Sequence, residues 1–248
     1  MSRQHIWKGL IMGEMIKISA KNLGQTALVD FCPRCYWIKL KLSNKLPWQT
    51  FPSIFSSIDS YTKHMAHHII DNHKNDLDKN PLPPWMADIG AITGYEKIPH
   101  FSKNLYQDKK SGITLSGIPD DIWNDAEGRR IIVDFKTQRW TENQDKLLPL
   151  YLVQANVYSV LFNTSEQDGM YLIYMEPCTE PSRCPDNVVE EGFRLCFSSK
   201  TVPVKWDRGL IRNALSRTRE IFDLDKPPDS LSGCKECGAV ENLINLLK

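Results

Sequence analysis

Residues 117–136 read GIPDDIWNDAEGRRIIVDFK, and this stretch decides the fold. Two short β-rich runs are separated here by a turn-like Asp-Ala-Glu-Gly segment that begins at Asp125. The second run contains Ile131-Ile132-Val133, which is apolar enough for a buried central strand. A third β-rich run comes directly before them. The predicted strands cover residues 113–119, 120–125 and 130–138.

Helical patterns flank this sheet region on both sides. Apolar residues in them recur at the 3.6-residue spacing of an amphipathic helix. Strands and helices in this order predict an α/β fold with a mixed central β-sheet flanked by helices. The other predicted elements are helices at about 51–75, 147–163 and 205–223 and strands near 170–176 and 192–198, followed by a loop-rich tail.

Three charged side chains are predicted to meet at the end of these strands. Asp134 and Lys136 are two residues apart, so on a strand they project to the same side. Opposite charges at the end of a buried strand are costly unless the protein uses them. Asp120 begins the preceding strand, and a hairpin would bring it to the same point. The alternative is an Asp–Lys pair on a solvated face, with Asp120 in a turn.

This set has the composition of a site for a hard metal ion. The carboxylates of Asp120 and Asp134 and the peptide carbonyl of Phe135 offer the oxygen ligands that Mg²⁺ and Mn²⁺ prefer. Such an ion lowers the pKa of a bound water and neutralises charge on a phosphoryl transition state. Lys136 would orient or help deprotonate that water, or stabilise the developing negative charge. We therefore expect phosphodiester hydrolysis that depends on Mg²⁺ or Mn²⁺.

A glutamine and a tyrosine on the following helix complete a series of motifs. Gln154 and Tyr158 are four residues apart and share one helix face. Taken alone, the pair is better explained as a surface glutamine and a core tyrosine than as part of a site. The order G-x-x-D (Gly117 to Asp120), apolar–D-x-K, Q-x-x-x-Y resembles the RecB-like branch of the PD-(D/E)XK nucleases. That branch includes the nuclease domains of RecB and AddB and the CRISPR-adaptation nucleases. The element CPRCYW at 32–37 is similar to one near the start of these domains.

The resemblance spans roughly residues 28–240 and implies a restriction-endonuclease-like PD-(D/E)XK core in a single domain, 1–248. The core is expected at about 51–200, with segments at about 15–50 and 200–240 joined through the cysteines to form a lobe. In these families the two acids bind the metal, the lysine is catalytic, and the Q-x-x-x-Y residues support the site or contact DNA. The residues that match these roles are Asp120, Asp134, Lys136, Gln154 and Tyr158.

One departure from the family pattern concerns the third metal ligand. Many relatives place a metal-binding histidine on the helix before the sheet, after a small residue and an apolar one. The best match here is Ser57-Ile58-Asp59, so Asp59 is predicted as a third oxygen ligand. An all-oxygen site would favour Mg²⁺ or Mn²⁺. His64 and His68, on a face further from the core, are the competing candidates.

Two cysteine pairs, Cys32/Cys35 and Cys234/Cys237, have the two-residue gap of metal ligation. They can share a metal only if the two ends of the domain meet. The two-plus-two pattern favours a structural Cys₄ zinc site, whereas the resemblance favours a [4Fe–4S] cluster, which those families bind with one cysteine plus three. Four unligated thiols are the third option. The remaining cysteines are expected to be ordinary small hydrophobic residues: Cys178, Cys184 and Cys196.

The bulk composition limits the class of protein. With 248 residues, 41% of them apolar and 25% charged, the chain is typical of a globular domain. Its net charge is +1, but residues 1–50 carry eight Lys/Arg against two acids, which fits either a phosphate-binding face or a solvated basic surface. No stretch has the ~20 apolar residues needed to cross a bilayer. We therefore expect a cytoplasmic protein.

The function expected from the sequence is a metal-dependent deoxyribonuclease that acts on ends or single strands of DNA, with RNA not excluded. A helicase or recombination partner would be a separate protein, because the chain has no helicase motif. Two alternatives are a catalytically inactive nucleic-acid-binding protein with the same fold and a zinc-containing interaction protein. The sequence leaves open exonuclease or endonuclease action and polarity, and the choice between iron–sulfur and zinc.

Overall fold

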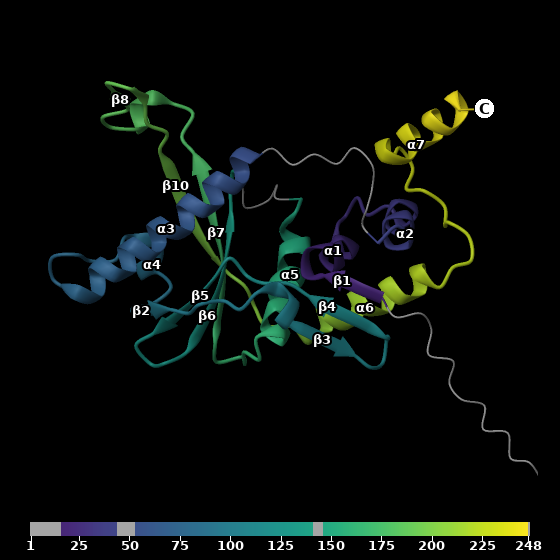
Figure 1. Cartoon of the computed structure of the whole chain (residues 1–248), viewed down its shortest axis with the longest axis horizontal. Helices are drawn as coiled ribbons and strands as arrows, with labels where there is room; N and C mark the ends of the chain where they lie inside the picture. Colours follow the sequence, from purple (N-terminus) through teal and green to yellow (C-terminus); the bar gives the residue numbers. More distant parts are fainter. Residues whose placement is uncertain (1–15, 44–52, 141–145, 248) are drawn as a thin grey trace, which may run out of the picture.

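A five-stranded mixed sheet forms the centre of the protein in the computed structural model, which describes residues 16–43, 53–140 and 146–247 (Figure 1). The strand order is β10-β7-β6-β5-β2. β6 and β7 run parallel, and the other neighbouring strands run antiparallel. The mixed α/β fold predicted from the sequence is therefore confirmed. The strands are β2 Ile92–Tyr95, β5 Asp121–Asp125, β6 Arg130–Lys136, β7 Gly169–Pro177 and β10 Phe197–Pro203.

The two faces of this sheet bury two separate hydrophobic cores. On β6, Ile131 and Val133 pack with α3 and α4, whereas Ile132 packs on the opposite face with α5 and α6. This alternation follows from the two-residue period of a strand. Because Asp134 and Lys136 continue the register of Ile132, they project toward the α5 face. The helices are α3 Ser53–Asn75, α4 Pro84–Ala87, α5 Leu148–Leu161 and α6 Arg208–Phe222.

A second, three-stranded sheet has the order β1-β4-β3. β1 pairs in parallel with β4, so that Ile16 lies opposite Ile113. The predicted strand at 113–119 is thus present, but it belongs to this smaller sheet. The central sheet instead takes β2 as its edge strand, which the sequence pattern did not indicate. The strands are β1 Ile16–Ser19, β3 Leu105–Asp108 and β4 Ile113–Ser116.

The N-terminal and C-terminal segments meet beside the smaller sheet. Two short helices follow β1, and α2 covers the sequence CPRCYWIKLK except for its first cysteine. The tail predicted to be rich in loops contains a twelve-residue helix, α7. An ion pair between Arg34 of α2 and Glu241 of α7 joins the two helices. The basic residues Arg3, Lys8 and Lys45 lie outside the described residues. The bounds are α1 Ala20–Gly24, η1 Gln25–Ala27, α2 Pro33–Lys41 and α7 Lys235–Leu246.

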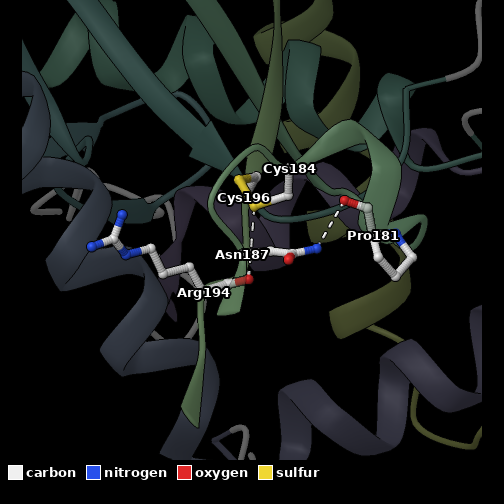
Figure 2. Close-up of a disulfide and its surroundings, with 5 residues drawn as sticks. All are labelled: Pro181, Cys184, Asn187, Arg194 and Cys196. Atoms are coloured by element: carbon white, nitrogen blue, oxygen red, sulfur yellow. Dashed lines mark hydrogen bonds between the residues drawn. A yellow bond between two sulfur atoms is a disulfide. The ribbon is translucent and has the colours of Figure 1, made fainter. Parts of the chain in front are cut away.

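A disulfide-linked arm connects β7 to β10. The arm carries a small hairpin, β8 Val188–Val189 and β9 Gly192–Phe193, and the predicted strand at 192–198 is divided between β9 and β10. A disulfide joins Cys184 to Cys196 across the base of the hairpin (Figure 2). The expectation that these two residues are ordinary free cysteines was therefore wrong. Their spacing of 12 residues carries no signal by itself; the hairpin brings their Cα atoms to 5.5 Å.

The described part of the chain also contains no helix long and apolar enough to span a bilayer.

Candidate active site

Asp134 and Lys136 lie side by side at the end of β6, as the sequence predicted. Asp134 is 3% exposed, and its Oδ2 atom forms an ion pair with the Lys136 ammonium. The ammonium also donates a 3.4 Å hydrogen bond to Oε1 of Gln154 and lies 4.1 Å from the centre of the Tyr151 ring. These contacts hold the lysine over the carboxylate rather than in solvent.

Asp120 approaches the same point from the residues that lead into β5. Its Oδ2 atom accepts a 2.7 Å hydrogen bond from the backbone N–H of Phe135. Burial, together with the negative charge of Asp134, raises the pKa of Asp120 to about 7, although Lys136 and the Phe135 N–H act in the opposite direction. Burial and the neighbouring carboxylate therefore disfavour the charged form of Asp120.

Gln154 and Tyr158 support this pair from α5. Nε2 of Gln154 donates a 2.7 Å hydrogen bond to the Tyr158 hydroxyl, while its Oε1 accepts from Lys136. Burial and then the charge of Asp134 raise the pKa of Tyr158 well above its usual value, so the phenol stays protonated. Two hydrogen bonds thus connect the tyrosine through the glutamine to the lysine.

The donor set fits a hard divalent cation. The carboxylates of Asp120 and Asp134 offer oxygen ligands. Burial and then the charge of Asp134 raise the pKa of Asp120, and a bound cation would favour its charged form. The carbonyl of Phe135 is the third candidate oxygen, on the residue whose N–H already binds Asp120.

Asp59 lies beside the site without completing a close ligand group. Its Oδ1 accepts a 3.2 Å hydrogen bond from the Thr137 hydroxyl. Among the described residues, the four cysteines, whose sulfurs lie within 4.8 Å of one another, are the only group of three or more side chains placed to hold a metal ion. Direct ligation by Asp59 would therefore require its carboxylate to move toward Asp120. The competing histidines, His64 and His68, are exposed and line neither cavity at the site.

Two neighbouring cavities open at the carboxylates. One, of about 340 Å³, contains the predicted residues together with Lys21 from α1. The other, of about 640 Å³, contains Lys63 and His67, which the sequence analysis missed. A signal for them exists, because Asp59, Lys63 and His67 recur every four residues along one side of α3. Asp59 and Asp120 line both cavities.

The four predicted cysteines converge where α2 meets α7. Sγ of Cys35 lies 3.5 Å from that of Cys234 and 3.3 Å from that of Cys237, and Cys32 lies 3.6 Å from Cys237. Although burial opposes it, the N–H groups of Cys35 and Leu231 lower the pKa of Cys32 to about 7. Burial and the neighbouring cysteines raise the pKa of Cys35 and of Cys237. Four sulfurs this close together can hold a metal ion.

Fold and site together define the class of the protein: an α/β domain of the nuclease type, with two aspartates and a lysine at the end of its central strands. The chain belongs to the PD-(D/E)XK nuclease superfamily, whose family model matches residues 41–240. No curated protein gives a significant match to the sequence.

Solved structures with a similar arrangement include two that cover most of the chain. The crystal structure of a protein designated SSO0001 has a TM-score of 0.39 and 16% identity, over 87% of this chain and 79% of that chain. An alkaline exonuclease (LHK-Exo) from Laribacter hongkongensis has a TM-score of 0.41 and 9% identity, over 94% of this chain and 95% of that chain.

Proposed function

We propose that the protein is a nuclease of the RecB-like branch that hydrolyses DNA phosphodiester bonds with Mg²⁺ or Mn²⁺, acting on ends or single strands. The observation that carries the proposal is the convergence of Asp120, Asp134 and Lys136 at one buried point. A protein that only binds nucleic acid gains nothing from two carboxylates that face a phosphate, because they repel it. Membership in the nuclease superfamily supports the same conclusion.

The residues have distinct tasks in this reaction. Asp120, Asp134 and the Phe135 carbonyl would hold the cation, which when bound acidifies water and neutralises charge on the phosphoryl group. Lys136 donates to the attacking water or to a phosphate oxygen. Gln154 fixes the position of the lysine through its amide oxygen, and Tyr158 fixes the amide.

The four cysteines form a second, structural centre in this proposal. The four sulfurs would hold either Zn²⁺ or a [4Fe–4S] cluster, and both join α2 to α7. The four cysteines line a cavity of their own. None of the residues around Asp134 lines that cavity. Its role is therefore stability of the domain rather than hydrolysis.

Cleavage of labelled single-stranded and double-stranded DNA in Mg²⁺ and in Mn²⁺ tests the proposal. Asp134→Ala and Lys136→Ala should each lower the cleavage rate by at least about 100-fold while leaving DNA binding intact. Asp78→Ala and Lys74→Ala are matched controls, because both residues are exposed on the surface. Robust metal-dependent cleavage by the two active-site variants would reject the site. A wild-type protein that binds DNA without turnover in either metal would reject the enzyme.

A further inference from the structure

We propose that the 640 Å³ cavity holds the nucleic-acid strand next to the bond that is cut, as a single strand, with Lys63 binding a phosphate and the His67–Tyr95 pair supporting a base. The inference rests on the proposed function, because it assigns a part of the same substrate to an adjoining surface. The cavity lies between α3, the end of β2 and the residues that lead into β5.

The position of the cavity connects it to the carboxylates. Asp59 and Asp120 form its border with the smaller cavity that contains Asp134 and Lys136. A strand whose phosphate lies at Asp120 therefore continues into this space. Its volume of about 640 Å³ is within the range of small-ligand sites, which suits a nucleotide unit.

Lys63 places a fixed positive charge on this path. Its ammonium donates a 2.8 Å hydrogen bond to the backbone carbonyl of Asp120, and the side chain is half-buried. An ammonium has three donors, and this contact uses one of them. In this proposal the other two donors bind a phosphate one step from Asp120. Lys97 lines the same cavity from an exposed position after β2.

The other acids around the cavity are bound to partners. Glu96 receives two hydrogen bonds of 2.8 Å from the Arg130 guanidinium, a bidentate pair. Asp121 is fully buried and accepts from Nε2 of His67 at 2.7 Å and from the indole of Trp123 at 2.9 Å. Apart from the carboxylates at the metal site, the lining is therefore favourable for a phosphate.

Two aromatic rings give the cavity a surface for a base. The His67 and Tyr95 rings are stacked with centroids 3.6 Å apart and planes within 6°. Contacts at both ends hold the stack, because Asp121 binds the histidine and the Tyr95 hydroxyl donates to Asp71 at 3.1 Å. Lysine side chains beside aromatic rings are a usual combination in single-strand sites, where stacking tolerates every base.

Binding of a fluorescent oligothymidine to the Lys136→Ala protein tests this assignment without cleavage. Lys63→Gln should weaken binding about tenfold and reduce the slope of log K against log salt by about 0.7, the contribution of one phosphate contact. Lys63→Arg should retain the slope, because it keeps the charge. Lys74→Gln is the matched control on the same helix, where the lysine is paired with Asp71. An unchanged slope in Lys63→Gln would overturn the phosphate contact.

The aromatic pair is tested separately in the same Lys136→Ala protein. Tyr95→Leu should weaken binding of the oligonucleotide about tenfold through loss of stacking, while Tyr95→Phe should bind like its parent because the ring remains. Thermal unfolding of both variants identifies any loss of folded protein. Equal binding by Tyr95→Leu would overturn the base surface. A larger effect of either residue on duplex than on single-stranded DNA would overturn the single-strand assignment.

Steady-state cleavage separates this inference from the proposed function. In protein with Lys136 intact, Lys63→Gln should raise KM about tenfold and change kcat less than about threefold, the result of lost uniform binding. If no metal supports cleavage while the salt slope still depends on Lys63, the nuclease fails and the strand site stands. If cleavage is normal and Lys63 and Tyr95 have no effect, the strand site fails and the nuclease stands.

Discussion

A Cβ atom at position 117 would lie 2.9 Å from Cε1 of Tyr158. The glycine of the G-x-x-D motif is therefore the surface against which the tyrosine of the Q-x-x-x-Y motif packs. The two motifs are 37 residues apart from Gly117 to Gln154, yet they form one structural unit. The tyrosine can hold Gln154 in place only because residue 117 has no side chain.

Gly117→Ala should displace the Tyr158 ring and with it the Gln154 amide. Overpacking of this kind costs about 1–3 kcal/mol, and we expect a comparable loss in the free energy of unfolding, measured in urea, together with a lower kcat. Gly94→Ala is the matched control, because a Cβ there meets nothing within 4 Å. Equal stability and activity of the two variants would show that the close approach has no effect.

Gln154→Ala should lower kcat more than it changes KM, because it removes the hydrogen bond that holds Lys136 over Asp134. A loss of about tenfold in kcat is expected for a positioning contact of this strength. Tyr158→Phe should have a smaller effect on kcat but should destabilise the fold by about 1–2 kcal/mol, because the buried amide donor of Gln154 loses its acceptor. Steady-state kinetics and urea unfolding of both variants check this order, and a larger kcat effect for Tyr158→Phe would contradict it.

The raised pKa of Asp120 predicts a specific dependence of stability on pH in metal-free protein. A folded-state pKa of about 7 against an ordinary value of 3.8 means that this group stabilises the fold most below pH 3.8. That contribution is lost as the pH rises through about 7. Asp120→Asn keeps an acceptor for the Phe135 N–H without the charge. The free energy of unfolding in urea should therefore be higher for Asp120→Asn than for wild type by a larger margin at pH 8 than at pH 5.

Saturating Mg²⁺ should reduce this advantage at pH 8, since a bound cation favours the charged carboxylate that the variant lacks. Wild type and Asp120→Asn contain the same other carboxylates, so the titration of those groups cancels in the difference between their free energies of unfolding. A difference between the two proteins that is independent of pH would contradict the raised pKa.

Loss of the cysteine centre should loosen the C-terminal helix before it affects the central sheet. Cys237→Ser removes a sulfur that lies near those of both Cys32 and Cys35. We expect loss of the bound metal, a lower Tm and faster proteolysis between α6 and α7. Cys178→Ser is the control, because Cys178 lies outside this group. Metal analysis and the absorbance spectrum of anaerobically purified protein distinguish iron and sulfide from one zinc; equal metal content in both variants would contradict the centre.

The parts of the structure that the sequence predicted correctly are those set by local pattern. The hairpin of β5 and β6 needs only a short turn, and its register pairs Asp121 with Val133. The two-residue period of a strand then places Asp134 and Lys136 together. A four-residue spacing likewise places Gln154 and Tyr158 on one side of α5, where they contact each other.

The parts that were missed depend on contacts between distant segments. β1 pairs with β4 about 100 residues further along the chain, and no local pattern encodes that register. The disulfide of Cys184 and Cys196 depends on the path of the arm between β7 and β10. Lys63 and His67 lie at the site only because Asp120 and Asp121 approach them in the folded chain. Periodicity along α3 cannot indicate that approach.

The cysteine group also sets an order of events during biosynthesis. Two of its sulfurs belong to Cys32 and Cys237, which are 205 positions apart in the sequence. While a ribosome is still translating the central sheet, only one half of the ligands exists. In the proposed metal centre, the complete ligand set would therefore exist only after synthesis of nearly the whole domain, and a chain that terminates early would carry an incomplete set. If this centre binds zinc or iron as proposed, the content of that metal would report how many molecules in a preparation have brought the two ends of the domain together.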